Sequence, residues 1–277
     1  MSKPEVTLPN YEAYYDYALQ FQPNQTFAKA AHKLASMIYK LRTSYDDGAR
    51  DVLGEAQRDN VRIFLASRHL TADDQYLLLA LAQNEEVLSH MKGCTLIPTE
   101  PSLQSRPLSK GGPLLRSATE NAGAISTFRL EDLKRQGIEI TPEIEEMHRA
   151  SIVRCADVFV EKIVNRDFHH AGYWEGTRNR TNHRTLLPLK KGIGYTACRV
   201  AQERPTIVVP VSHYFGGEPK DYRKGDVPHP RRPDMHIGMP FEVTPASTPE
   251  LLIAQLAPAL QSGIDITVAR SLEIPIR

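Results

Sequence analysis

The chain has 277 residues, a formal net charge of +1 at pH 7, and ordinary fractions of hydrophobic (41%) and charged (24%) residues. This length is enough for one large domain, or for one domain with a helical appendage. A chain so close to neutral offers no global surface for a polyanion, so we expect no nucleic-acid partner, and any anion site must be local.

Cysteine usage and apolar runs indicate the compartment. The three cysteines lie far apart and without a CxxC spacing, which indicates neither a disulfide framework nor a structural zinc site and is typical of a reducing compartment. No run approaches the roughly 18 uninterrupted apolar residues typical of a spanning helix, and the first residues lack the apolar core of a signal peptide. We therefore expect a soluble, cytoplasmic protein.

The first 50 residues differ from the rest of the chain. No acidic residue lies between Asp16 and Asp46, while positive charge comes from Lys29, Lys33, Lys40 and Arg42. Apolar residues recur there at helical spacing and predict one amphipathic stripe, formed by Phe27, Ala31, Leu34, Ile38, Leu41 and Tyr45. Such a basic helix can lie on an anionic membrane surface or pack on its own domain. The same two alternatives hold for the aromatic residues Tyr11, Tyr14, Tyr15 and Tyr17.

An α/β pattern begins at residue 61. VRIFLA (61–66) predicts a short buried strand, and DDQYLLLALAQ after it predicts a helix. His69 therefore lies on the loop that leaves a strand, and Asp74 lies in the first turn of the next helix. In an open sheet this end of a strand is the usual place for an active site. A histidine held by a carboxylate can act as a general base, although this spacing also arises by chance.

Two further elements and one loop follow. Thr141-Pro142, with acidic residues directly after them, predicts a helix start, and the helix runs to about Val164. TIVVPV (206–211) predicts a second buried strand. Residues 216–234 are rich in proline, glycine and charge and predict a solvated loop.

The stretch YWEGTRNRTNHRTLLPLKKG (173–192) combines arginines, lysines and glycines. A guanidinium grips phosphate with two parallel hydrogen bonds, and a glycine lets the backbone approach it, although a charged surface loop would have the same composition. KGIGYTA (191–197) fits a dinucleotide fingerprint, but no acidic residue ends a strand about twenty residues later. The neighbouring histidines lack the spacing of metal ligands, so we expect incidental surface residues: His169, His170 and His183.

Four blocks in this order resemble the glycerolipid acyltransferases, a superfamily that includes lysophosphatidic acid and glycerol-3-phosphate acyltransferases. The first block is a histidine, four residues and an aspartate, here His69 to Asp74. The second is a glycine followed six residues later by an arginine, here Gly123 to Arg129. The third is EGTR (175–178) with the downstream PLKKG, and the fourth is an apolar strand around a proline, VVPV (208–211). Three departures bear on the acceptor: Arg68 replaces a common asparagine, Trp174 a common proline, and Ser126-Thr127 an aromatic–aliphatic pair.

The resemblance implies an α/β fold with a central mixed sheet flanked by helices. Residues 1–50 would be an N-terminal helical segment that can contact a membrane surface, and residues 51–277 the acyltransferase catalytic domain. The implied reaction moves a fatty acyl group from a thioester to a hydroxyl in phospholipid biosynthesis. Acyl-CoA or acyl carrier protein would be the co-substrate, 1-acylglycerol-3-phosphate the first choice of acceptor, and neither a metal nor another cofactor would be needed.

The resemblance also implies roles for individual residues. His69 would be the general base and Asp74 the residue that orients it. The acceptor site would be shaped by Glu175, Gly176 and Thr177. The acceptor phosphate would be held by Arg129 and Arg178, and the phosphates of the donor by Lys190 and Lys191.

Three alternatives stay open at this point. The acceptor could be glycerol-3-phosphate, as in a glycerol-3-phosphate 1-O-acyltransferase, or another lysolipid. The chain could also be a non-catalytic lipid-binding relative, although the presence of both His69 and Asp74 argues against this. Because the product would be a lipid, we expect a peripheral contact with the inner face of the cell membrane, for which residues 17–45 are the candidate.

Overall fold

The computed structural model describes residues 3–71, 74–105, 112–216 and 232–272. The solvated loop predicted at 216–234 lies largely outside these residues. The strands are β1 (Arg42–Tyr45), β2 (Arg62–Ser67), β3 (Thr95–Thr99), β4 (Ala124–Ser126), β5 (His169–Tyr173), β6 (Thr206–Tyr214), β7 (Asp234–Ile237) and β8 (Phe241–Val243). The α-helices are α1 (Tyr11–Gln20), α2 (Gln25–Ile38), α3 (Ala49–Arg58), α4 (Asp74–Asn84), α5 (Gly112–Asn121), α6 (Leu130–Arg135), α7 (Pro142–Asn165), α8 (Lys191–Val200) and α9 (Pro249–Leu272). Short 3₁₀ helices are η1 (Leu8–Asn10), η2 (Glu86–Met91) and η3 (Pro101–Leu103).

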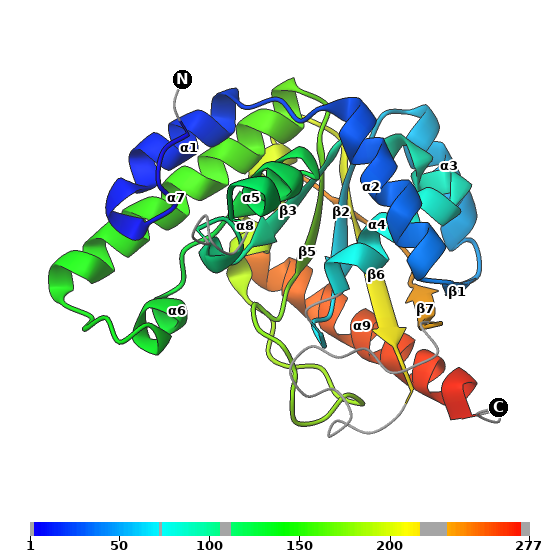
Figure 1. The fold of residues 1–277 in the computed structure, drawn as a ribbon. Helices are drawn as coiled ribbons and strands as arrows, with labels where there is room; N and C mark the ends of the chain where they lie inside the picture. Colours follow the sequence, from blue (N-terminus) through cyan, green and yellow to red (C-terminus); the bar gives the residue numbers. More distant parts are fainter. Residues whose placement is uncertain (1–2, 72–73, 106–111, 217–231, 273–277) are drawn as a thin grey trace.

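The described strands form one mixed sheet of eight strands, in the order β1-β7-β6-β2-β5-β3-β4, with β8 pairing with β6. The strands from β6 to β4 in this order run parallel to one another, whereas β7 and β8 run antiparallel to β6. Helices cover both faces of the sheet (Figure 1). The predicted fold class, a mixed sheet flanked by helices, is confirmed.

Alternation along the central strands builds a core on each face. In β2, Phe64 and Ala66 join the core beneath α1, α7, α8 and α9, while Ile63 and Leu65 join the core beneath α3 and α4. Every residue of β2 and β6 is buried, as the apolar runs predicted. β6 continues beyond the predicted strand to Tyr214, and the helix predicted from Pro142 runs to Asn165.

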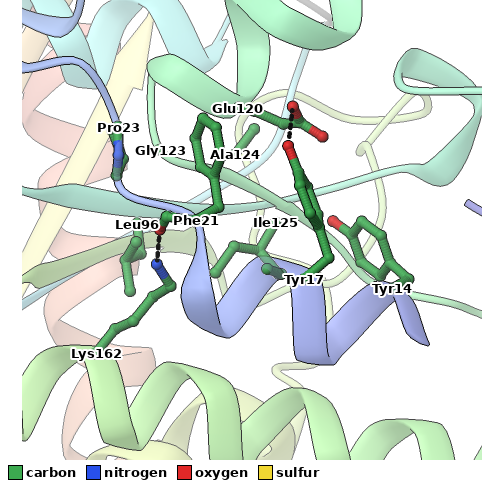
Figure 2. Close-up of a pocket in the computed structure, with 11 residues that line it drawn as sticks. Tyr14, Tyr17, Phe21, Pro23, Leu96, Glu120, Gly123, Ala124, Ile125 and Lys162 are labelled. Atoms are coloured by element: carbon green, nitrogen blue, oxygen red, sulfur yellow. Dashed lines mark hydrogen bonds between the residues drawn. The ribbon is translucent and has the colours of Figure 1, made fainter. Parts of the chain in front are cut away.

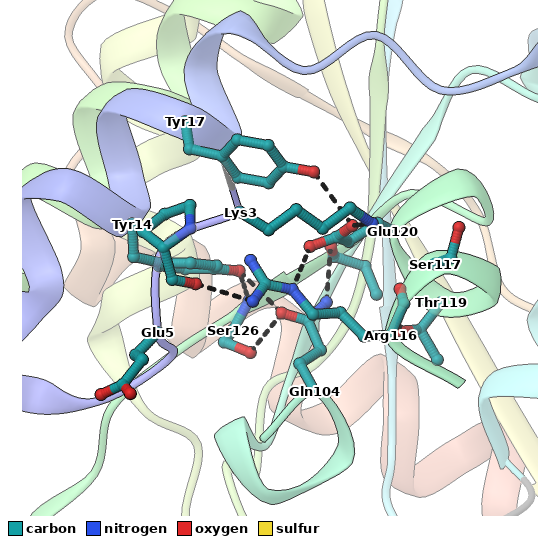
Figure 3. A network of polar contacts seen from close by, with 12 residues as sticks. Lys3, Glu5, Tyr14, Tyr17, Gln104, Arg116, Ser117, Thr119, Glu120 and Ser126 are labelled. Atoms are coloured by element: carbon teal, nitrogen blue, oxygen red, sulfur yellow. Dashed lines mark hydrogen bonds and ion pairs between the residues drawn. The ribbon is translucent and has the colours of Figure 1, made fainter. Parts of the chain in front are cut away.

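The N-terminal helix α1 packs on α7 (Figure 1). Tyr14 and Tyr15 are buried, and the hydroxyl of Tyr15 donates to the Ser126 carbonyl at 3.0 Å. These two rings therefore belong to the core and are not available to an aromatic belt. Figure 3 shows a polar network at the same junction, in which Glu120 accepts from Lys3 at 2.7 Å and from Tyr17 at 3.1 Å.

A buried lysine donates a hydrogen bond to the C-terminal end of α1. Lys162, from α7, donates to the carbonyl of Phe21 at 2.6 Å, and burial lowers the pKa of Lys162 to about 8 (Figure 2). The small pocket around this contact is lined by α1, α7 and the starts of β3 and β4, and the residues that line it include none of the predicted site residues. We therefore assign this junction a role in packing.

The observed helix α2 is shorter than the apolar stripe that the sequence predicts for it. α2 ends at Ile38, and Arg42–Tyr45 form β1, which pairs in parallel with β7. The helix turns its small residues Ala28 and Ala35 inward onto α4, because small side chains allow a close approach. Its large apolar side chains are consequently exposed: Phe27, Leu34, Met37 and Ile38. The part of the predicted stripe that lies in α2 therefore faces outward, whereas Leu41 and Tyr45 pack against the core.

Among the described helices, α9 is long and apolar enough to cross a membrane, by length and composition alone. The expectation that no helix spans a membrane stays a prediction, because a helix in the core of a protein passes the same test of length and composition. Leu252, Leu256 and Leu260 are buried at intervals of four residues, and the helix packs on β6, β7 and α8. A helix that covers a sheet in this way has the same composition as a spanning helix.

Candidate active site

Asp74 fixes the turn between β2 and α4. Its carboxylate accepts from the backbone N–H of Thr71 at 2.9 Å, from the Thr71 hydroxyl at 2.7 Å, and from the backbone N–H of Leu70. The carboxylate is buried at the first residue of α4, where the partial positive charge of a helix favours an anion. The predicted strand, turn and helix are therefore present, and His69 lies in the turn that Asp74 organises.

His69 and Asp74 are in direct contact. His69 Nδ1 lies 2.9 Å from Asp74 Oδ2, and the ring of His69 stacks on Tyr173 with 4.2 Å between ring centroids. Burial raises the pKa of Asp74, but the neighbouring His213 and His69 outweigh it and hold this pKa well below its usual range. An ionised Asp74 can only accept, so Nδ1 of His69 carries a proton and Nε2 is the basic nitrogen of the neutral ring.

Glu175 holds the backbone of His69. Its side chain is fully buried, and one oxygen accepts from the His69 backbone N–H while the other accepts from the Leu187 N–H at 2.7 Å. Burial raises the pKa of Glu175, and these two hydrogen bonds lower it in part. The carboxylate thus connects the EGTR turn to the turn that contains His69. Glu175 therefore positions the backbone of His69. The sequence predicted a different role for it, in shaping the acceptor site.

Arg129 also reaches the EGTR turn. Its Nη1 donates to the Gly176 carbonyl at 2.6 Å, and its Nε and Nη2 donate to the Asp132 carboxylate at 2.8 and 3.0 Å. Three of its five N–H groups are therefore used in contacts among the described residues. The structure brings the second and third sequence blocks together, but the fork predicted to hold phosphate is largely occupied by Asp132.

The other predicted binding residues differ in burial and in the contacts that they make. Arg178 is half-buried; burial and Arg180 lower its pKa, whereas Glu100 and Asp74 act in the opposite direction, and the guanidinium stays charged. Thr177 is exposed in the same turn. The Lys190 side chain lies against Gly176, where a Cβ would come within 3.0 Å of it. Lys191 instead forms an ion pair with Glu250 at 2.7 Å.

One histidine at this site was missed in the sequence. His213 Nε2 lies 3.2 Å from Asp74 Oδ1, so the aspartate contacts two imidazole rings. The sequence does contain a sign of this contact, in the position of each histidine relative to its strand. β2 and β6 pair in parallel with Ser67 opposite Val211, and His69 and His213 each follow two residues later. A histidine just after the second buried strand could therefore have been noticed, but the pairing register was needed to place it beside His69.

The predicted surface histidines are buried. His169 and His170 lie in β5, and burial lowers the pKa of each to about 3, in His169 with a contribution from His90. Burial likewise lowers the pKa of His183 to about 4, with a smaller effect of Arg68. The prediction that these histidines lie on the surface was therefore wrong. His169 and His170 are enclosed because β5 lies between β2 and β3 in the sheet.

Gly123 lies directly before β4, the strand that leads to Arg129, and its substitution tests the stability of this turn. Its φ is +88°, and an added Cβ would lie 1.9 Å from the Thr95 carbonyl oxygen. Gly123→Ala should lower the free energy of unfolding by about 2–5 kcal/mol, from left-handed strain and steric overlap together. Gly137→Ala is the matched control, because its φ is +79° and an added Cβ meets nothing within 4 Å. Chemical denaturation would measure both, and an equal loss in the two variants would contradict the steric argument.

Comparison with known proteins identifies a structure with a similar fold. No family model matches the chain, and no curated protein matches it in sequence. The structure is similar to the crystal structure of the 1-acyl-sn-glycerophosphate (LPA) acyltransferase PlsC from Thermotoga maritima, with a TM-score of 0.54, 15% identity, and coverage of 96% of this chain and 84% of that chain. At this identity the similarity shows a shared fold.

Proposed function

We propose that the protein is an O-acyltransferase that moves a fatty acyl group from acyl-CoA or acyl carrier protein to the hydroxyl of a glycerol-phosphate-type acceptor, with 1-acylglycerol-3-phosphate as the first choice. The observation that carries the proposal is the His69–Asp74 contact at the end of β2, held against the EGTR turn by Glu175. The similarity of fold to an LPA acyltransferase supports the same class of reaction.

The chemistry follows from the basic nitrogen of His69. Nε2 takes the proton of the acceptor hydroxyl as its oxygen attacks the thioester carbonyl carbon, and Asp74 stabilises the imidazolium that forms. The carbon–sulfur bond then breaks, and the departing thiolate takes the proton from His69. No enzyme nucleophile is required, because the thioester is already activated and the acceptor supplies the oxygen.

An acceptor screen tests the proposal. The purified full chain is given an acyl-CoA and, in separate reactions, 1-acylglycerol-3-phosphate, glycerol-3-phosphate, or a lysolipid without a phosphomonoester. Thiol release and mass spectrometry of the product are recorded, with His69→Ala as the control. We expect acceptor-dependent thiol release and an acylated product from the parent chain. Lipid binding without any turnover, with acyl-CoA or with acyl carrier protein, would instead identify a non-catalytic lipid-binding relative.

We further propose that the protein works at a membrane surface and contacts it through the outer face of α2. Leu34 and Met37 are 58% and 61% exposed, and the exposed lysines Lys29, Lys33 and Lys40 belong to the same helix and its end. Apolar side chains among lysines match an anionic lipid surface. Arg42 does not belong to this face in our proposal, because it forms an ion pair with Asp234.

Vesicle flotation tests the membrane contact. Each lysine near an anionic surface contributes about 1 kcal/mol, so changing Lys29, Lys33 and Lys40 to Gln should weaken binding to phosphatidylglycerol vesicles roughly a hundredfold. Leu34→Ser with Met37→Ser should weaken it even at low salt. The matched control is Ile152→Ser with Val153→Ser, which removes two exposed apolar side chains from α7. Binding that is unchanged by the α2 variants would rule this face out.

A further inference from the structure

The end of α1 leaves a small pocket against α7 and the starts of β3 and β4 (Figure 2). Most of the side chains that line it are apolar, and they include Ala18, Phe21, Leu96 and Ile125. Its volume is about 20 Å³, which is room for roughly one or two atoms of the size of water. The few polar groups at this pocket therefore decide what it can bind, in addition to its place in the packing of α1.

Lys162 brings a buried positive charge to the pocket. The residue is 2% exposed, and its ammonium lies 5.4 Å from the centre of the Phe168 ring. Among the residues that the structure describes, no carboxylate forms an ion pair with Lys162, and the charged neighbour that acts on its pKa is Arg166, which is also positive. A buried cation without an anion beside it is unfavourable. The charge of Lys162 is thus unbalanced at this point.

The hydrogen bonds of Lys162 are also incomplete. An ammonium has three N–H donors, and one of them donates to the carbonyl of Phe21 at 2.6 Å. This bond has a structural explanation, because a basic side chain is favourable at the C-terminal end of a helix. The ring of Phe168 offers a further attraction to the charge but no oxygen acceptor. Two donors of Lys162 therefore have no oxygen acceptor within the described part of the chain.

Glu120 also lines the pocket, but its charge is balanced elsewhere (Figure 3). One oxygen accepts from Lys3 at 2.7 Å and from Tyr17 at 3.1 Å, and the other accepts from Arg116 Nε at 2.7 Å. Two cations thus face this one carboxylate, and Glu120 is not among the groups that act on the pKa of Lys162. The charged side chains at the pocket consequently have a positive sum, which favours an anionic ligand.

We propose that this pocket binds a small monovalent anion, a halide ion or one oxygen of a small carboxylate, against the ammonium of Lys162. The anion accepts from the N–H groups that Phe21 leaves free, and the apolar walls strengthen the attraction between the charges by excluding water. A pocket with room for one or two atoms cannot enclose a phosphate or a sulfate. The site is separate from the proposed acyl-transfer site, because none of the residues that line it belongs to that site.

The link between α1 and α2 runs past the pocket. Phe21 and Pro23, which belong to this link, line it. Asn24 then caps α2, because its side chain accepts from the backbone N–H of Phe27 at 3.0 Å. An anion that fixes Lys162 should also fix the Phe21 carbonyl. Its binding should therefore stabilise the link between the two helices and raise the melting temperature of the protein.

The charges around Lys162 give the sign of the effect on its pKa. Burial lowers this pKa to about 8, with a smaller effect of Arg166. An anion beside the ammonium favours the charged form, so binding should raise the pKa. Binding should in turn weaken as the pH rises above about 8 and the ammonium loses its proton. Tyr14 and Tyr17 also line the pocket, but burial raises the pKa of both, so neither gains a charge in this range.

The experiment follows the side-chain signals of isotope-labelled lysines in the full-length protein by NMR, with Lys162 assigned by the loss of its signal in Lys162→Met. Sodium chloride or sodium acetate replaces sodium sulfate at constant ionic strength. An anion that binds should raise the Lys162 pKa by about one pH unit and raise the melting temperature to a plateau. Lys162→Met should lose this dependence of the melting temperature on the anion. The control Lys134→Met, which removes an exposed lysine of α6, should keep it.

The two anions distinguish the sources of the charge. A response to acetate alone indicates a carboxylate ligand, a response to chloride alone indicates a halide, and a response to either or both supports the anion site. If neither anion changes the Lys162 pKa or the melting temperature, the pocket holds water only and the proposal is overturned. Because the pKa is measured in the unmutated protein, a failure of Lys162→Met to fold does not end the test. Acyl transfer is not measured, so the outcome is independent of the proposed function.

Discussion

His69→Ala should reduce acyl transfer by about 10²–10⁴-fold, the usual contribution of a positioned general base, while the protein stays folded. Its side chain is partly exposed, and its ring contacts Asp74 and Tyr173, so its removal leaves the backbone bonds of the turn in place. The double variant with Asp74→Ala should lose little more activity than the worse single variant, because base and orienting residue act as a unit.

Asp74→Ala should behave differently from His69→Ala in one respect. It should lose comparable activity, but it should also lower the free energy of unfolding by about 1–3 kcal/mol for each buried donor left without a partner. The backbone N–H and hydroxyl of Thr71 are two such donors. Steady-state kinetics and thermal melts on the same samples separate the two effects. Near-normal turnover by folded His69→Ala would show that the reaction does not use this base.

Arg178→Ala should raise the KM for a phosphorylated acceptor roughly ten- to a hundredfold, as expected for the loss of charge-assisted hydrogen bonds worth about 1.5–3 kcal/mol. The KM for the acyl donor should stay nearly constant, since the residue is expected to grip the acceptor. Arg178→Lys should recover only part of the loss, because lysine keeps the charge and lacks the planar fork. The measurement is the KM for each substrate with the other saturating.

Arg129→Ala provides the comparison. Arg129 holds the Gly176 carbonyl and Asp132, so its removal should loosen the EGTR turn and impair phosphorylated and unphosphorylated acceptors alike. Arg178→Ala should affect the phosphorylated acceptor alone. If the parent chain used both kinds of acceptor equally well, a phosphate clamp would be excluded, although acyl transfer itself could stand.

The parts of the fold that could be predicted are those decided by local sequence. The buried strands β2 and β6 followed from apolar runs, and α7 followed from its Thr141-Pro142 start and acidic first turn. The turn that carries His69 was therefore placed correctly, together with its contact to Asp74.

The parts that could not be predicted are decided by residues far away in the chain. RTSY becomes β1 because it pairs with β7, whose residues lie 192 positions later. The direction of the α2 stripe depends on which side of this helix packs on α4. The small residues of α2 pack there, so its large apolar residues face outward. The occupation of Arg129 by Asp132 and the approach of His213 to Asp74 likewise require the assembled sheet.

The placement of β1 makes the start of the chain an integral part of the sheet. β1 forms the edge of the sheet, and its backbone pairs with one side of β7. A truncation that begins at residue 51 would leave that side of β7 with a row of unpaired N–H and C=O groups, which is a template for pairing with another chain. Shortened versions of this protein should consequently self-associate more readily than the full chain, which light scattering of the two at equal concentration would measure.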